Sequence, residues 1–158
     1  MFKLLVISCL VACAYGNSAG APEDSCDDMT PKHPADPQKS PFPYKVTVNR
    51  NQVRAGENVE ITVGGGRTFK GFLLQVRGGN KAVGQFQNGG GDKYWKTIKC
   101  HDNDKSTATH KNATEKKNLK LIWKAPSAPG KYTVYATVAQ DGGTFWAYHP
   151  TETINVVA

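Results

Sequence analysis

The stretch Tyr132-Thr-Val-Tyr-Ala-Thr-Val138 decides the fold class of this chain. Side chains alternate between the two faces of a β-strand, so every second residue of the stretch lies on the same face. The residues on one face are Tyr132, Val134, Ala136 and Val138. The residues on the other face are Thr133, Tyr135 and Thr137. This period of two, in a run of β-branched and aromatic residues, predicts a strand whose apolar face is buried in a core.

Short stretches of the same kind lie on both sides of it, separated by turns rich in glycine, proline and asparagine. With 131–139, the strands that we expect are 44–48, 59–63, 69–77, 82–86, 106–110, 119–123, 144–148 and 152–157. Only 113–118 has a helical composition, and it is short. Eight or nine short strands at this spacing predict an all-β fold, a single antiparallel β-sandwich of the immunoglobulin or fibronectin III type.

The composition agrees with one small all-β domain. The chain has 158 residues, a formal net charge of +7, 16 glycines and 9 prolines. A single domain is expected at this length. So many turn-forming residues leave little room for long helices, which excludes a helical bundle, a coiled coil and a doubly wound α/β enzyme.

Residues 1–16 have the pattern of a secretory signal. A short basic start at Met1-Phe-Lys3 precedes the apolar stretch 4–14, and Ala14 and Gly16 occupy the small-residue positions of a cleavage site. The apolar stretch is too short to span a membrane. We therefore expect cleavage after Gly16 and a secreted, extracellular product of residues 17–158 with no membrane span.

Two cysteines remain after this cleavage, Cys26 and Cys100. In an oxidising compartment they can form one disulfide, and two free thiols are the alternative. Six prolines in residues 17–43 exclude regular strands and helices there. We expect this N-terminal segment to lie extended over the sandwich of residues 44–158, held at Cys26.

Several motifs occur in the order found in a known family. They are Gly20-Ala-Pro22, Cys26, Pro43-Tyr44, Phe69-Lys-Gly-Phe72, Val83-Gly-Gln-Phe86, Cys100, Trp123-Lys-Ala-Pro126 and Phe145-Trp146. In this order the chain resembles the reeler domain over nearly all of residues 17–158, and in particular the secreted, single-domain insect immune proteins of the noduler, or defense protein, type. The resemblance implies a sandwich of eight or nine strands, secretion into haemolymph and a role in innate immunity. The family's cysteine pattern maps onto Cys26 and Cys100. It supplies no catalytic residue to carry over.

Lysines are concentrated in one part of the chain. They are Lys93, Lys96, Lys99, Lys105, Lys111, Lys116, Lys117, Lys120 and Lys124. An excess of positive charge attracts anionic partners over long range, such as lipopolysaccharide phosphates, lipoteichoic acid or sulfated glycans. We take Lys111, Lys116, Lys117 and Lys120 as candidate ligand-binding residues. The alternative is a solvated polar edge that prevents aggregation of strands. Nucleic acid is not expected, because no recognition helix or stacking motif is present.

Aromatic pairs next to glycine-rich turns form a second candidate set. Tyr94-Trp95 follows one such turn and Phe145-Trp146 follows another. Neighbouring residues of a strand point to opposite faces, so one side chain of the second pair should face outward. Trp95 and Trp146 are therefore candidates for stacking on a sugar ring, and ordinary core packing is the alternative. Trp123, in an apolar strand, belongs to the core.

Catalytic and metal-binding motifs are not found in the sequence. The four histidines, His33, His101, His110 and His149, lack the i, i+2 and i, i+4 spacings of metal ligands. No nucleophile motif or phosphate-binding loop occurs. We expect a protein that is not an enzyme and needs no metal or cofactor. Asn112-Ala-Thr114 is an acceptor sequence for N-glycosylation.

Together these features predict a secreted innate-immune defense protein with antimicrobial action. It would bind lipopolysaccharide, lipoteichoic acid and glucan on microbial surfaces and promote aggregation and nodulation, with microbial envelope polymers and the haemocyte surface as partners. An extracellular matrix or adhesion module without an antimicrobial role is the alternative.

Overall fold

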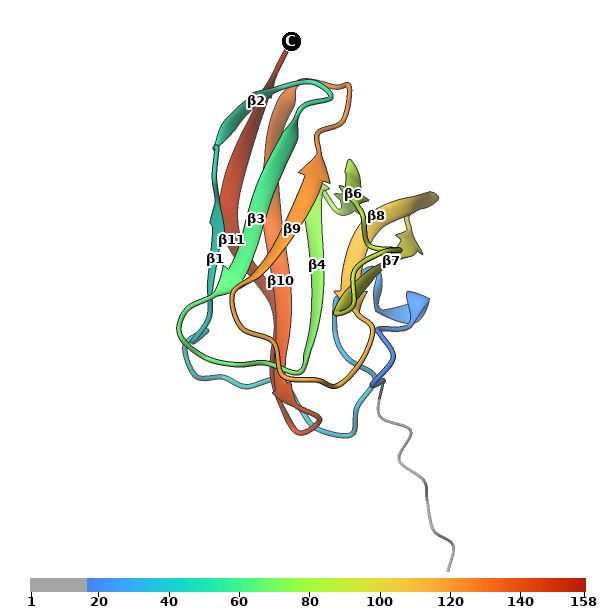
Figure 1. Cartoon of the computed structure of the whole chain (residues 1–158), viewed down its shortest axis with the longest axis vertical. Coiled ribbons are helices and arrows are strands. Elements are labelled where there is room, and N and C mark those ends of the chain that lie inside the picture. Colours follow the sequence, from blue (N-terminus) through green and yellow to red (C-terminus); the bar gives the residue numbers. More distant parts are fainter. Residues whose placement is uncertain (1–16) are drawn as a thin grey trace, which may run out of the picture.

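Two β-sheets pack face to face in the computed structural model, which describes residues 17–158 (Figure 1). The secretory signal predicted for residues 1–16 lies outside the described residues. A single 3-10 turn, η1 (Glu23–Ser25), precedes the strands. The strands are β1 (Lys45–Val48), β2 (Gln52–Arg54), β3 (Asn58–Gly64), β4 (Gly71–Gly78), β5 (Lys81–Ala82), β6 (Gln85–Gln87), β7 (Trp95–Cys100), β8 (Asn103–His110), β9 (Leu119–Lys124), β10 (Gly130–Asp141) and β11 (Thr144–Val157).

The two sheets differ in size. One has four strands in the order β1-β3-β9-β6, and the other has seven, in the order β2-β11-β10-β4-β8-β7 with β5 paired to β4. Neighbouring strands are antiparallel except β2 and β11, which are parallel. The predicted all-β sandwich is confirmed, with this one parallel pair added. Among the described residues, no helix is long and apolar enough to cross a membrane.

The structure has more strands than the eight or nine that the sequence predicts. β2 has only three residues, which is too short to show a pattern. β7 has three partly buried residues in its centre and a buried residue at each end, so it shows no alternation of apolar and polar residues. Its backbone is instead paired along β8.

The last strand is longer than expected. The sequence predicts two strands, 144–148 and 152–157, because Pro150 lies between them. The structure has the single strand β11, and the pairing register with β10 shifts on either side of the Tyr135–Pro150 pair. Proline is tolerated in a sheet at such irregularities, because no regular ladder hydrogen bond is lost there.

The core lies between the sheets and matches the predicted alternation. In β10 the buried face carries Tyr132, Val134, Ala136 and Val138. In β9 it carries Leu119, Leu121 and Trp123. Both faces of the sandwich core therefore come from strands whose period of two is visible in the sequence.

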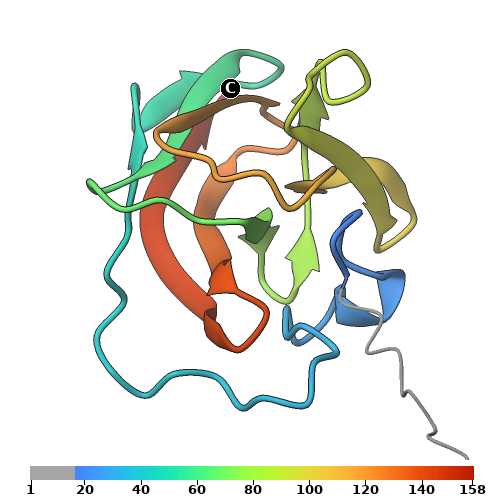
Figure 2. The same cartoon turned by 60° about the horizontal axis from the view of Figure 1, so that its bottom comes forward.

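The N-terminal segment forms a third layer. Residues 17–43 run along the outside of the domain before β1 (Figure 2), and Met29 is fully buried. The Thr137 hydroxyl of β10 donates a hydrogen bond to the Met29 carbonyl at 2.6 Å. As a result, β4 is buried along both faces through seven of its eight residues. The expectation that this segment lies over the sandwich is confirmed.

A disulfide and a buried arginine hold this layer in place. Cys26 and Cys100 are bonded, with their Cα atoms 5.5 Å apart, as predicted. Arg77 of β4 is 3% exposed, and its guanidinium donates to the carbonyls of Cys26 and Asp27, each at 2.8 Å. The Gln75 side chain also donates to the Cys26 carbonyl. These bonds satisfy the buried polar groups of β4 and fix the segment around Cys26 against the sheet.

Candidate functional site

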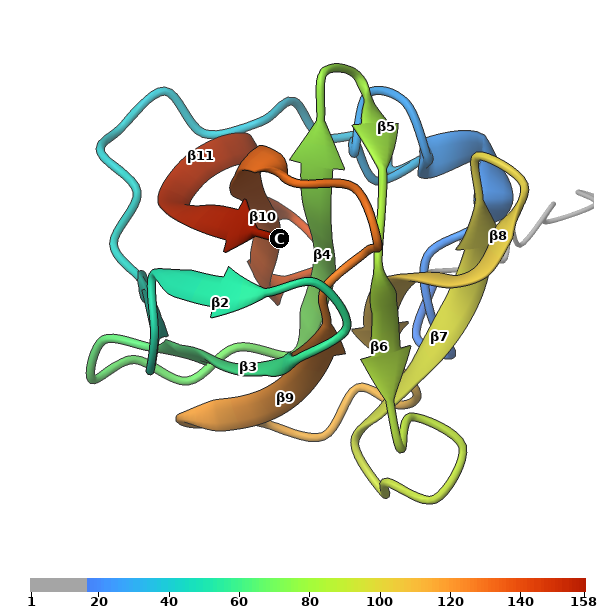
Figure 3. The same ribbon diagram turned by 90° about the horizontal axis from the view of Figure 1, so that it is seen from above.

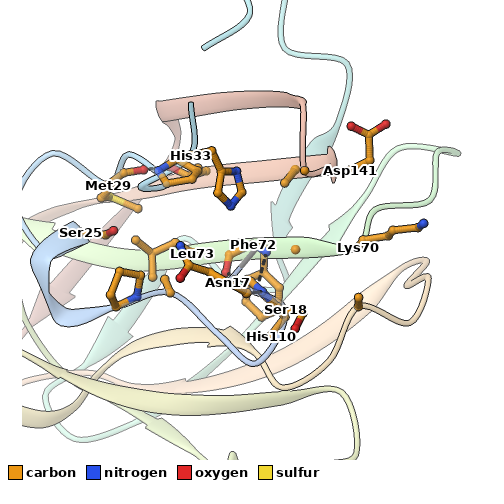
Figure 4. Close-up of a pocket in the computed structure, with 18 residues that line it drawn as sticks. Asn17, Ser18, Ser25, Met29, His33, Lys70, Phe72, Leu73, His110 and Asp141 are labelled. Atoms are coloured by element: carbon orange, nitrogen blue, oxygen red, sulfur yellow. Dashed lines mark hydrogen bonds between the residues drawn. The ribbon is translucent and has the colours of Figure 1, made fainter. Parts of the chain in front are cut away.

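A cleft of about 150 Å³ opens between the N-terminal segment and the outer face of the seven-stranded sheet (Figure 4). One wall comes from residues 17–33 and the other from β4, the end of β8 and the end of β10. Its apolar lining consists of Ala21, Pro22, Met29, Pro31, Phe72, Leu73, Ala113 and Ala139. Lys70 and Asp141 stand together at one end of it (Figure 4).

His110 connects the two walls of this cleft. The Phe72 amide donates to Nδ1 of His110 at 3.1 Å, so the proton of the neutral ring is on Nε2. Nε2 then donates to the carbonyl of Asn17 at 2.6 Å. Burial lowers the pKa of His110; the hydrogen bond to the Asn17 carbonyl opposes this effect, and the charges of Lys116 and Lys96 reinforce it. The geometry therefore requires the neutral imidazole.

The pH dependence of stability follows from this arrangement. Because the pKa of His110 is lower in the folded chain, the unfolded chain binds more protons, and stability falls as pH drops below about 6.5. We expect the denaturant midpoint to be lower at pH 5 than at pH 7.5, and His110→Gln to reduce this difference. Urea melts of both proteins at the two pH values measure it. An unchanged difference in the variant would exclude His110 as the cause.

Lys116 is not a surface residue, which corrects the expectation that it belongs to a wet ligand-binding face. Its residue is 3% exposed, and its ammonium group donates to the carbonyls of Lys70 and Asn112 at 2.8 Å and of Thr114 at 2.7 Å. Burial lowers the pKa of Lys116 to about 8. The backbone of Lys116 is paired with Phe69 in an isolated bridge, so this residue is held against the protein rather than in a free loop. Lys116 therefore fixes the loop between β8 and β9.

A matched pair of lysines tests this structural role. Lys116→Met leaves three carbonyl groups without a donor and should lower the free energy of unfolding by about 1–3 kcal/mol. Lys117→Met removes the same charge from an exposed neighbour and should change stability by less than about 0.5 kcal/mol. Chemical melts of the two variants give the comparison. Equal stability would mean that the ammonium of Lys116 is not enclosed.

The other lysines of the candidate set differ in their availability. Lys111 donates to the carbonyls of Gly90 and Asp92, so its ammonium is bound to the glycine-rich loop. Lys117 is exposed, and Lys120 is exposed with Glu60 at 3.8 Å. Two of the four candidates, Lys117 and Lys120, are therefore exposed residues, and Lys120 lies in an ion pair with Glu60. The exposed lysines of the whole stretch are Lys93, Lys99, Lys105, Lys117, Lys120 and Lys124.

The candidate tryptophans are also buried. Trp95 is 2% exposed and packs edge-to-face against Phe86, while Trp146 is 7% exposed and packs against Tyr44. The expectation that either Phe145 or Trp146 faces outward is wrong. Phe145 lies beneath the N-terminal segment, where its carbonyl accepts from the amide of Gln38 and its ring meets His33. The N-terminal segment therefore buries the face of β11 that the alternation predicts to be exposed.

A different aromatic pair is accessible, and no local sequence pattern indicates it. Tyr135 and Tyr148 stack with ring centroids 4.6 Å apart, and Tyr148 is 41% exposed. The Arg77 guanidinium lies 4.9 Å from the Tyr148 ring and donates to its hydroxyl at 3.2 Å. The two tyrosines meet only because β10 and β11 pair. The backbone of Tyr148 is left-handed, with a φ of 51°.

The predicted glycosylation sequence lies in the loop after β8. Asn112 is half-buried, and its amide nitrogen donates to the Lys93 carbonyl at 2.9 Å. Ala113 and Thr114 are exposed. In residues 17–158, no group of three or more His, Cys, Asp or Glu side chains could hold a metal ion.

Known proteins are similar to this chain over most of its length. The reeler domain family matches residues 24–158. "Putative defense protein Hdd11" of Hyphantria cunea is 37% identical over 147 residues, covering 89% of this chain and 88% of that protein. "Defense protein l(2)34Fc" of Drosophila melanogaster is 36% identical over 162 residues, covering 99% of each chain.

The fold has a counterpart among solved structures. The human F-spondin reeler domain superposes with a TM-score of 0.63 at 14% identity, covering 78% of this chain and 95% of that domain. At this identity the likeness concerns the fold alone. Together with the family match over residues 24–158 and the two similar insect proteins, it shows that this chain belongs to the reeler domain family.

Proposed function

We propose that this chain is a secreted innate-immune defense protein that binds anionic polymers of microbial envelopes and promotes aggregation and nodulation of microbes. The observation that carries the proposal is the set of six exposed lysines between Lys93 and Lys124, in a family whose insect members are named defense proteins. Among residues 17–158, only Lys120 of the six lies within 4 Å of a carboxylate. The Lys93 ammonium lies over the Tyr94 ring, 4.8 Å from its centroid, and Lys99, Lys105, Lys117 and Lys124 are exposed without an ion pair in this part of the chain.

These lysines come from two parts of the fold. Lys93, Lys99 and Lys105 lie on or beside the β7–β8 ribbon, and Figure 3 shows this ribbon at one side of the domain, away from β2 and β3. Lys117, Lys120 and Lys124 lie on β9 and the loop before it. Charge at such exposed positions attracts a polyanion over long range and requires no preformed pocket.

Glucan carries no charge, so its binding needs another surface. The stacked pair of Tyr135 and Tyr148 includes an exposed residue, Tyr148, whose ring is held by Tyr135 and Arg77, and it replaces Trp95 and Trp146 as the aromatic candidate. Flat aromatic rings of this kind combine apolar area with a polar tip, which suits the apolar face and hydroxyl edge of a sugar.

The test compares charge-matched variants on purified polymers. One variant carries Lys93, Lys99 and Lys105 as glutamine, a second carries Lys117, Lys120 and Lys124 as glutamine, and the control carries Lys39, Lys45 and Lys131 as glutamine. Each exposed lysine contributes roughly 0.2–1 kcal/mol, so one or both test variants should bind lipopolysaccharide and lipoteichoic acid about tenfold more weakly. The control should lose less than about twofold, and binding by the parent should weaken steeply with salt. Tyr148→Ala should weaken binding to soluble β-glucan alone.

Two results would overturn the proposal. If neither test variant binds more weakly than the control, the lysine stretch is not the binding surface. If the parent binds none of the polymers, or binds with no dependence on salt, an extracellular matrix or adhesion module becomes the better interpretation. Thermal melts of every variant show that the fold is retained, because surface changes of this type alter stability little.

A further inference from the structure

The cleft beneath the N-terminal segment has the walls of an apolar binding site. Pro22, Met29 and Pro31 line it from the N-terminal segment, and Leu73 and Ala139 line it from the seven-stranded sheet. Cavities of about 150 Å³ with such walls hold a molecule of the size of benzene, whereas a whole drug-sized ligand needs about 300–1,000 Å³. The cleft therefore has room for one apolar part of a ligand, and the remainder must lie outside.

A polar hollow adjoins the cleft and shares two residues with it. Lys70 and Asp141 line both, and the hollow is completed by Arg67, Thr68, Glu115 and Gln140. It has two cations and two carboxylates, and within residues 17–158 none of these four charges lies in an ion pair. Such a surface offers hydrogen-bond donors and acceptors with little net charge. That matches a head group rich in hydroxyls better than a single phosphate or carboxylate.

A third observation lies inside the cleft. Nδ1 of His33 is buried and has no hydrogen-bond partner within the described chain. Buried polar atoms are nearly always paired, so an unpaired one that lines a cavity indicates a missing partner. Figure 4 shows His33 on the wall opposite Phe72 and His110, on the side where Asp141 stands. A turn of the His33 ring toward the cleft would let this nitrogen bond a ligand hydroxyl at the border of the polar hollow.

We propose that the cleft binds the end of an acyl chain of a glycolipid, whose sugar hydroxyls lie over the polar hollow formed by Arg67, Lys70, Glu115 and Asp141. The cleft would bind the acyl chain without help from the exposed lysines. The inference rests on the proposed function only for the source of the glycolipid, which is the lipid-anchored polymers of microbial envelopes. The lysines would then attract the polymer, and the cleft would hold its lipid anchor.

The experiment uses octyl glucoside below its micelle-forming concentration, with glucose as the matched probe that lacks the chain. Titration calorimetry should show saturable binding of octyl glucoside and none of glucose. Ala139→Leu fills the cleft from β10 and should weaken this binding at least tenfold. Ala128→Leu adds the same three carbons at an exposed position beyond the other end of β10, and it should bind like the parent.

Two more variants keep the test decisive. Ala113→Leu fills the cleft from the loop after β8 if Ala139→Leu does not fold, and it retains the Asn-x-Thr sequence. His33→Phe keeps the ring against Phe145 and removes the nitrogen, so it should weaken binding of octyl glucoside about threefold or more. The inference would be overturned if Ala139→Leu and Ala113→Leu both bind octyl glucoside like the parent, or if the parent does not bind octyl glucoside.

The failure of this inference and of the proposed function can be told apart. The lysine variants should bind octyl glucoside like the parent, because the probe is uncharged. If they also bind lipopolysaccharide like the parent while Ala139→Leu loses octyl glucoside, the cleft is a lipid site and the lysine surface is not involved. If the lysine variants lose lipopolysaccharide but octyl glucoside does not bind, only the cleft is excluded.

Discussion

Replacement of Trp123 by alanine should lower the free energy of unfolding by about 3–5 kcal/mol, the largest effect that we expect from one substitution. Its side chain is fully buried between the sheets, and the indole nitrogen donates to the Val83 carbonyl at 3.0 Å. Gly84, which follows Val83 in the chain, has a φ of 70°, and a Cβ at this position would clash with the indole of Trp123. Because the backbone is shaped around the ring, it cannot collapse into the space that alanine leaves.

Chemical denaturation at constant temperature measures this loss. Ile122→Ala is the matched control, because Ile122 is the preceding residue of β9 and is only partly buried. The control should lose clearly less stability than Trp123→Ala. A loss below about 1 kcal/mol for Trp123→Ala, with an unchanged dependence on denaturant, would contradict the register that pairs Trp123 with Val59 and Phe86.

Removal of the disulfide should have the second-largest effect. With both Cys26 and Cys100 changed to serine, the free energy of unfolding should fall by about 2–4 kcal/mol, since the bond closes a long loop with a sequence separation of 74. The loss of free energy of unfolding should stay below the maximum that the entropy of closing such a loop would give. Arg77, Gln75 and Thr137 still hold the N-terminal segment by hydrogen bonds to its carbonyls.

Two measurements check this prediction. Peptide mapping without reduction should recover Cys26 and Cys100 in one linked pair, and recovery of both as free thiols would contradict it. Urea melts of the double serine variant then give the size of the effect. The variant should still show the near-ultraviolet signal of a packed Trp123, because the bond lies outside the core between the sheets.

The part of the fold that the sequence predicts is the part built from strands with one buried face. The alternation in Tyr132–Val138 and in Leu119–Trp123 is visible because the opposite face of each strand is at least partly in contact with solvent and carries more polar residues. β7 has no such pattern, because Lys96, Thr97 and Ile98 in its centre are all only partly buried and its two lysines lie three residues apart. Pro150 hides the continuity of β11, because a proline ends a strand unless the neighbouring pairing is irregular.

The candidate site is harder to predict, for a physical reason. Charge and aromatic character can be read from a sequence, but exposure depends on contacts between distant residues. Lys116 is enclosed by carbonyls of Lys70, Asn112 and Thr114, and Trp146 by the N-terminal segment, whose Ser40 accepts from its indole nitrogen at 3.2 Å. The cleft likewise combines residues 17–33 with residues 70–73 and 137–142, and no local pattern connects them.

The N-terminal layer also sets the order in which the molecule can be assembled. Asn17 meets His110, 93 residues later, and Met29 meets Thr137, 108 residues later. Contacts between residues so far apart must wait until β4, β8 and β10 have formed a surface to receive them. We therefore expect the first residues of the domain to be placed late in folding. In that order both sheets and the Trp123 core form before the cleft does, and we expect the ability to bind a lipid chain to be acquired after most of the stability.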